Sequence, residues 1–245
     1  MVYFAWKGVY ASNVVQAPWR KRIYADIGGR MLNLFDIKKN VYGEIYNKQG
    51  VVINNGIIIN NHITTTKETI PYSIFFFGSA SIRKGIDIAL NVLERVRQSH
   101  PLATLHIVGK EYELYKRKHL NKEESYIVNY GHLEGELLWH TLMKAHIFIF
   151  PSRGETFGLA LCEAMALQKS VVASTFPTFQ EIITDKVDGF IAHNEEEYYK
   201  YITYLFEDET LNKNMAKKAA QKAQLYNFED NVNHSLLYYQ KILTL

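Results

Sequence analysis

Short apolar runs alternate with helical apolar patterns from about residue 72 to the end of the chain. The apolar runs predict buried strands, because they are brief and rich in Ile, Val and Phe. They are Ser73–Phe77, Ala103–Val108, Tyr126–Tyr130, His146–Phe150, Ser170–Ala173 and Gly189–Ala192. The segments between them predict helices, namely Gly85–Ser99, Glu111–Leu120, Glu134–Ala145, Phe157–Leu167 and a helix that begins at Pro177. This alternation favours an α/β fold with a parallel sheet and right-handed crossovers.

The two ends of the chain have different patterns. The C-terminal part predicts amphipathic helices over Glu195–Phe206, Thr210–Gln224 and Phe228–Leu243. Residues 1–60 mix aromatic and basic side chains and are too few for a complete doubly wound domain. A short strand at Val51–Ile53 and a linker at Asn60–Glu68 are expected there. The pattern therefore predicts a reduced N-terminal portion over 1–60 and one larger domain over 61–245.

Composition narrows the class of protein. With 245 residues and 47% apolar content, the chain can build one or two globular domains. The net charge of +3 does not favour nucleic acid as a partner. The single cysteine, Cys162, excludes a disulfide framework and a cysteine-rich metal site. No signal peptide or membrane-spanning run is expected, which favours the cytoplasm. The basic patch Trp19–Arg22 offers peripheral membrane contact as an alternative role for the N-terminal portion.

One carboxylate in the chain lies where burial is expected. The helix Phe157–Leu167 has no polar face, and Glu163 is its only charge. We therefore expect the helix to be buried on all sides and Glu163 to need a partner. That partner is either an internal cation or amide, or the hydroxyl groups of a ligand. The helix start also offers free N–H groups that suit a phosphate.

The loops that follow the strands carry further candidates. Ligands of an open parallel sheet bind beyond the carboxyl ends of its strands. The loop Gly78–Gly85 contains Arg83 and Lys84, Glu155 follows a later strand, and Gly109 and His132 follow the two strands between. A solvated cation pair, a tight glycine turn or a carboxylate at a helix start explains each of these alone. Cations and carboxylates on the same sheet edge together indicate an anion site beside hydroxyl acceptors, which a nucleotide sugar requires.

These residues resemble those of a known family. The matching segments are Phe77–Gly85, Leu105–Gly109, Pro151–Leu159, Val171–Ser174 and Glu181–Ile191, and Glu155 with Glu163 matches an E-x7-E pair. From about Val51 onward the chain resembles the donor-binding half of GT-B glycosyltransferases, the retaining group 1 type of glycosyltransferase family 4. Ser79 stands where many members have Arg, and Arg83 is a candidate substitute. The resemblance implies a Rossmann-like fold and sugar transfer from a nucleotide-sugar donor with retention of configuration.

The resemblance also implies a role for each matching position. Lys84, helped by Arg83, would neutralise the donor diphosphate, and Glu155 would hold the transferred sugar at the reacting centre. Glu163 would accept hydrogen bonds from the ribose hydroxyls. The donor would be bordered by the remaining residues: Gly78, Ser79, Gly109, His132, Leu133, Thr156, Phe157, Gly158 and Leu159. No metal ion or cofactor is expected, because cations and helix start would supply the positive charge.

The first 60 residues do not identify how an acceptor would be bound. A complete N-terminal domain binds the acceptor in the family, so this chain would need its reduced portion, a second polypeptide or a homodimer partner for a glycan, lipid or protein acceptor. The alternative is a binding or regulatory module that keeps the donor pocket and does not catalyse transfer. Half of a split glycosyltransferase is the related possibility.

Overall fold

The computed structural model describes residues 55–58, 68–120 and 124–243. Contacts divide the chain into one unit, Ile57–Phe228, and a second that joins Met1–Gly56 to Glu229–Leu245. The predicted strand Val51–Ile53 and the basic patch Trp19–Arg22 lie outside the described residues, so both stay predictions. The proposed domain boundary near residue 60 also stays a prediction.

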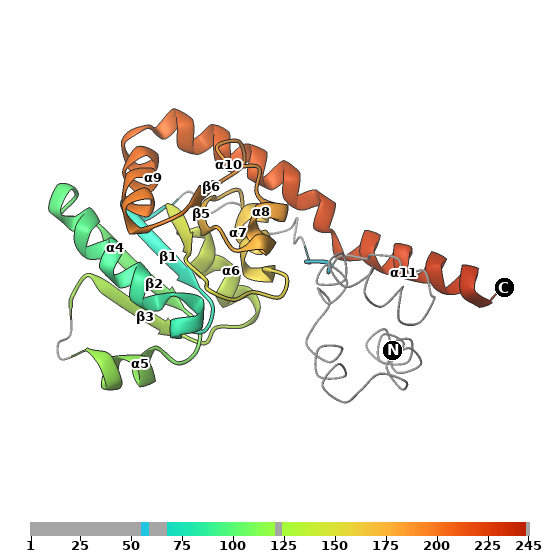
Figure 1. The fold of residues 1–245 in the computed structure, drawn as a ribbon, viewed down its shortest axis with the longest axis horizontal. Helices are drawn as coiled ribbons and strands as arrows, with labels where there is room; N and C mark the ends of the chain where they lie inside the picture. The colour runs from blue at the N-terminus through green and yellow to red at the C-terminus, as the bar shows by residue number, and fades with distance from the viewer. Residues whose placement is uncertain (1–54, 59–67, 121–123, 244–245) are drawn as a thin grey trace. The chain divides into compact units, whose positions relative to one another are not determined.

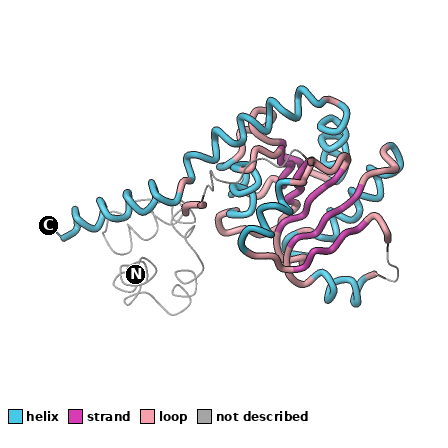
Figure 2. Tube along the Cα trace, turned by 180° about the vertical axis from the view of Figure 1, so that it is seen from behind, coloured by secondary structure: helices cyan, strands magenta, loops and turns pink. Residues whose placement is uncertain are grey.

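The first unit contains a parallel sheet of the predicted kind (Figures 1 and 2). Its strands are β1 (Ser73–Phe77), β2 (Thr104–Val108), β3 (Ile127–Gly131), β4 (Ile147–Phe150), β5 (Ser170–Ser174) and β6 (Phe190–Ala192). They lie in the order β3-β2-β1-β4-β5-β6, and every adjacent pair is parallel. The strand order reverses between β1 and β4, which is the Rossmann-like arrangement. Ligands of such sheets bind at this switch point.

Helices connect the strands as the apolar spacing predicts. The connecting helices are α4 (Ile86–Ser99), α5 (Tyr112–His119), α6 (Gly135–Met143), α7 (Leu159–Ala166) and α8 (Pro177–Ile182), with a short 3₁₀ turn η2 (Ile82–Lys84) before α4. After the sheet come α9 (Glu195–Glu207), α10 (Glu209–Ala223), the 3₁₀ turn η3 (Gln224–Tyr226) and α11 (Phe228–Leu243). Pro177 occupies the first turn of α8, as expected. No helix among the described residues is both long enough and apolar enough to cross a membrane.

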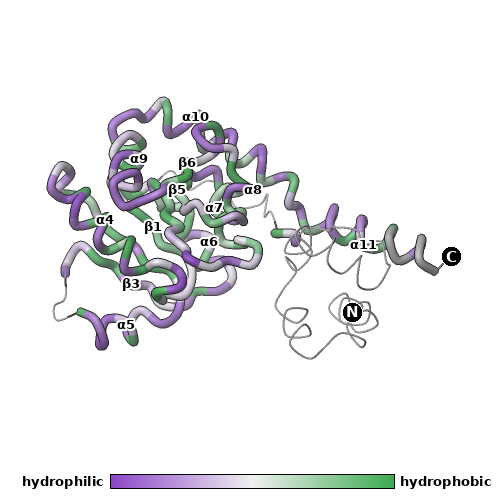
Figure 3. The backbone as a smooth tube through the Cα atoms, in the orientation of Figure 1, coloured by the Kyte–Doolittle hydropathy of each residue, from purple (hydrophilic) through white to green (hydrophobic). Residues whose placement is uncertain are grey.

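Two apolar layers hold the sheet between the helices. Successive strand residues point to opposite faces, so Ile74 and Phe76 join one cluster while Phe75 joins the other. The first cluster includes side chains of α4 and α9, and the second includes α7, α8 and α10. Figure 3 shows the strands as apolar segments beneath helices of mixed hydropathy. Because both faces are covered, the strands are nearly continuous apolar runs.

The helix α7 departs from the predicted burial. Leu161, Cys162, Ala164 and Met165 are buried against the sheet, but Leu159 is 42% exposed. The expectation that this helix is buried on all sides was therefore wrong. Its first turn lies at the rim of the sheet, beyond the carboxyl end of β4. This rim carries the candidate site.

Candidate functional site

The loops after β1 and β4 pack directly against each other at the switch point. Gly85 has a positive φ of 78°, and a β-carbon there would lie 2.1 Å from the Pro151 carbonyl oxygen. Only glycine fits such an approach of two backbones. Opposite η2, the Arg153 amide donates to the Arg83 carbonyl oxygen at 2.8 Å. The sequence Arg-Lys-Gly after β1 is therefore held against the loop that carries Glu155.

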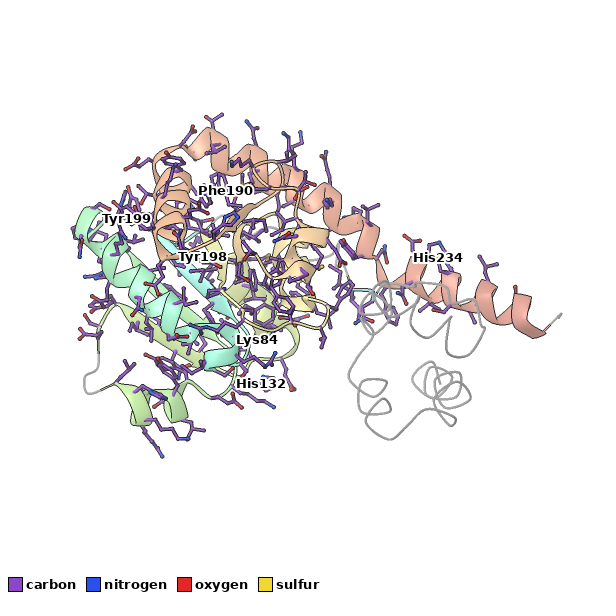
Figure 4. All side chains as sticks on the ribbon, in the orientation of Figure 1. Lys84, His132, Phe190, Tyr198, Tyr199 and His234 are labelled. Carbon is purple, nitrogen blue, oxygen red and sulfur yellow. The ribbon has the colours of Figure 1, made fainter. Side chains whose placement is uncertain are left out.

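Lys84 and Glu155 form an ion pair across this junction. The Lys84 Nζ donates to Glu155 Oε2, and the two side chains are only 20% and 12% exposed. The other carboxylate oxygen, Oε1, accepts from the Thr156 amide at 3.1 Å. Figure 4 labels Lys84 at this edge of the sheet, together with His132. Two residues that the sequence singled out separately thus meet in one place.

Arginines reinforce the same junction. Arg83 Nη1 donates to the Gly154 carbonyl oxygen at 2.8 Å. Arg153, which the sequence analysis passed over, makes a bidentate ion pair with Asp87, with both N···O distances at 2.7 Å. Burial opposes ionisation of Asp87, but hydrogen bonding and charge from Arg153 outweigh it and lower the pKa of that carboxyl. The hydrogen bonds that Arg153 donates to the Asp87 carboxylate correspondingly raise the pKa of Arg153.

Glu163 lies on α7 and is partly buried. No described residue makes a hydrogen bond or ion pair to its carboxylate. Burial raises the pKa of Glu163 to about 7. Of the two partners that the sequence allowed, an internal cation is therefore not found in this part of the chain. A group that can donate hydrogen bonds to a carboxylate would suit the position.

The start of α7 is open in a way that suits an anion. Gly158 caps the helix with a positive φ of 90° and brings no side chain to the first turn. A β-carbon at this position would lie 3.2 Å from the Phe179 ring, which favours glycine again. Phe157 is buried and anchors the loop, while Leu159 faces outward. The first N–H groups of a helix have no intrahelical acceptor and carry positive partial charge.

A pocket of about 440 Å³ lies beyond β2 and β3 on the same edge. Gly109 and His132 line it, as does Glu111, whose carboxylate accepts from the Ser79 hydroxyl. Gly109 packs against Gly78, so the loops after β1 and β2 are also in contact. The remaining lining residues are Lys110, Tyr112, Glu113, Leu114, Arg117, Asn129 and Gly131. The Ser79–Glu111 hydrogen bond joins the loop after β1 to a residue that lines this pocket.

The predicted site residues therefore fall into two groups. Lys84, Arg83 and Glu155 gather at the β1–β4 junction, where Thr156 and the start of α7 also lie. Gly109 and His132 gather at the pocket beyond β2 and β3. Leu133 packs partly buried against the apolar layer instead, and His132 pairs with Glu134 at 2.9 Å. The sequence patterns did not single out Arg153, Asp87 or Glu111. Each lies two or three positions from a predicted residue, Arg153 near Glu155, Asp87 near Lys84 and Glu111 near Gly109, and this proximity was a usable signal.

Comparison with known proteins defines the class. A family model described as "Glycosyl transferases group 1" matches residues 60–222. An uncharacterized glycosyltransferase of Methanocaldococcus jannaschii is 24% identical over 193 residues, which is 78% of this chain and 53% of that protein. A GDP-mannose:cellobiosyl-diphosphopolyprenol alpha-mannosyltransferase of Xanthomonas oryzae pv. oryzae is 26% identical over 150 residues, 59% of this chain and 40% of that protein.

A solved structure supports the fold. The pneumococcal O-GlcNAc transferase GtfA, crystallised with UDP and GlcNAc, superposes with a TM-score of 0.68 at 21% identity and covers 85% of this chain and 44% of that one. The α/β fold with its switch point is thus that of GT-B glycosyltransferases. Since the family model matches more than half of the sequence, the chain belongs to the group 1 glycosyltransferase family. It spans about half, or less, of the length of the curated relatives named above.

Proposed function

We propose that this chain binds a nucleotide sugar and transfers its sugar to an acceptor hydroxyl with retention of configuration, as a member of glycosyltransferase family 4. The observation that carries the proposal is the meeting of Lys84 and Glu155 at the switch point, directly before the helix that bears Glu163. A cation, a carboxylate and a helix start come together where such folds bind ligands. This is the set of groups that a sugar diphosphate requires.

Each of these residues would contact a different part of the donor. Lys84, with the N–H groups at the start of α7, would neutralise the diphosphate, so the charge of the leaving group is stabilised as it develops. Glu155 would release Lys84 and accept hydrogen bonds from hydroxyls of the transferred sugar. Glu163 would accept from the ribose hydroxyls, which offsets the cost of its burial. The base would enter the pocket at Gly109 and His132.

The reaction then exchanges one bond to the anomeric carbon for another. The bond from that carbon to the diphosphate oxygen breaks, and the electron pair leaves with the diphosphate. The acceptor oxygen forms the new bond on the same face, and its proton passes to the departing diphosphate. Lys84 and the α7 amides supply positive charge in place of a metal ion. No group of three His, Cys, Asp or Glu side chains suited to a metal occurs in the described ranges. Metal independence remains part of the proposal.

Calorimetric titration with UDP, GDP, UDP-glucose, UDP-GlcNAc and GDP-mannose tests the donor site. We expect one nucleotide series to bind, and Lys84→Met to weaken binding tenfold or more because a phosphate-binding cation is lost. Lys200→Met, which removes an exposed lysine on α9, is the matched control and should bind like wild type. A folded wild-type protein that binds none of the five compounds would overturn the proposal.

A binding module or half of a split enzyme is the second candidate. The chain spans 53% and 40% of the two curated relatives named above. This reading predicts nucleotide-sugar binding without sugar release or transfer. Release or transfer of labelled sugar by the wild type, abolished in Glu155→Gln while binding of the bare nucleotide diphosphate is kept, would exclude it.

A further inference from the structure

Arg153 and Asp87 join the two loops that carry Lys84 and Glu155. Arg153 lies two residues before Glu155, and Asp87 lies three residues after Lys84 in the first turn of α4. Their bidentate contact is thus a direct link between the segments bearing the two proposed donor-binding charges. Arg153 Nη1 also donates to the Ile82 carbonyl oxygen at 2.7 Å.

Further hydrogen bonds run in both directions between the two loops. The Arg153 amide donates to the Arg83 carbonyl oxygen, and the Arg83 guanidinium donates to the Gly154 carbonyl oxygen, both at 2.8 Å. Each loop therefore donates to the backbone of the other. We call this set of contacts among Arg83, Asp87, Arg153 and the carbonyls of Ile82 and Gly154 the loop clasp. The clasp fixes the backbone on both sides of the Lys84–Glu155 ion pair.

The Arg153 guanidinium makes three hydrogen bonds to protein groups. Its bonds to Asp87 and Ile82 use the planar fork of donors that suits a carboxylate, a geometry that lysine cannot reproduce. The side chains of Arg153 and Asp87 are 45% and 29% exposed, so the pair contributes little to global stability. Its effect is instead geometric, because two rigidly linked loops lose less freedom when a ligand orders them.

We infer that Arg153 and Asp87 are positioning residues, which fix the backbones of the two loops that bear Lys84 and Glu155. The inference rests on the proposed function. With the clasp closed, the backbones stay fixed while the Lys84 and Glu155 side chains part to receive the diphosphate and the sugar. With it open, the two loops move independently, and a ligand must order both of them when it binds.

Binding by clasp variants tests the inference. The nucleotide diphosphate that wild type prefers among UDP and GDP is titrated into Arg153→Gln, Arg153→Lys and Asp87→Asn, with unfolding by urea measured on the same samples. We expect each variant to weaken binding about tenfold, while stability changes little. The double variant D87R/R153D restores the opposite charges and should recover part of the affinity. Arg95→Gln, which breaks an exposed pair between α4 and Glu196 on α9, is the matched control.

A double-mutant comparison distinguishes a positioning role of Arg153 from a general loosening of the fold. If Arg153 acts through Lys84, then Arg153→Gln added to Lys84→Met should weaken binding much less than it weakens wild type. Additive effects, or clasp variants that bind as tightly as wild type, would overturn the inference and leave the proposed donor site intact. A folded wild type that binds neither nucleotide would overturn the proposed function and the inference together.

Discussion

Gly109 and Gly78 approach so closely that a β-carbon at position 109 would lie 1.9 Å from the Gly78 carbonyl oxygen. The loops after β2 and β1 are therefore in backbone contact beside the pocket. Gly109 also has a positive φ of 149°, a conformation that side-chain-bearing residues rarely adopt.

Gly109→Ala should consequently destabilise the fold, both through a clash of the new β-carbon with the Gly78 carbonyl oxygen and through the positive φ. The positive φ alone costs about 1–2 kcal/mol for a residue with a β-carbon. Gly131→Ala is the matched control, because Gly131 also has a positive φ of 66° but nothing lies within 4 Å of an added β-carbon. Urea titrations should show a clearly larger loss of unfolding free energy for position 109. Equal losses at the two positions would mean that the contact with Gly78 is relaxed in solution.

Glu163 should make stability depend on pH in an unusual direction. Folding raises the pKa of its carboxyl from 4.5 to about 7, so the folded protein binds this proton more tightly than the unfolded chain. The resulting stabilisation is complete below about pH 4.5, declines as the pH rises and is lost above about pH 7. At about 1.4 kcal/mol for each pKa unit, the change is on the order of 3 kcal/mol.

Glu163→Gln removes that titration. We expect the variant to be more stable than wild type at pH 8, with a difference that shrinks toward pH 5, in urea unfolding at both pH values. Glu136→Gln, at an exposed position on α6, provides the control and should leave the profile unchanged. A wild type and a Glu163→Gln variant with parallel pH profiles would show that the carboxylate finds a partner in solution.

A buried polar contact fixes α10 to the sheet. The Ser170 hydroxyl donates to Asn212 Oδ1 at 2.6 Å, and Asn212 Nδ2 donates to the Leu205 carbonyl oxygen at 3.1 Å. Asn212→Ala should lower the unfolding free energy by about 1–3 kcal/mol, because these buried groups lose their partners. Asn214→Ala, at an exposed position of the same helix, should change it by less than about 0.5 kcal/mol. Thermal unfolding of both variants measures the difference.

Lys84 and Glu155 should be energetically coupled even without a ligand. In a cycle of Lys84→Met, Glu155→Gln and the double variant, we expect a coupling of about 1 kcal/mol in unfolding free energy, since both side chains are mostly buried. The exposed pair Lys213–Glu209 on α10 serves as the reference, with a coupling below about 0.5 kcal/mol. A coupling near zero at the switch point would mean that solvent separates the two charges.

The fold was largely predictable because both faces of its sheet are covered. Strands such as β1 and β4 are then unbroken apolar runs, and the predicted bounds agree with the observed ones to within about two residues. The burial of α7 was predicted less well. Its sequence is apolar apart from Glu163, yet Leu159 is exposed, because the position of a helix relative to the sheet rim is a tertiary property.

The position of the candidate residues on one sheet edge was predictable, but their contacts were not. A parallel sheet implies that the loops with Lys84 and Glu155 lie on one edge, and this holds. That they touch depends on β1 and β4 being neighbours, which no local pattern encodes. The pairing of Arg153 with Asp87 could not be predicted for the same reason, because 66 positions separate the two residues along the chain.

The pairing of β1 with β4 also determines when the candidate site can form during folding. All of α4, β2, α5, β3 and α6 lies between the two strands along the chain. During synthesis, the segment that bears Lys84 emerges before the one that bears Glu155. Until β4 has been made, β1 lacks its neighbour on that side of the sheet. Distant pairings of this kind form slowly. The candidate site is thus completed late in maturation, only when the centre of the sheet closes.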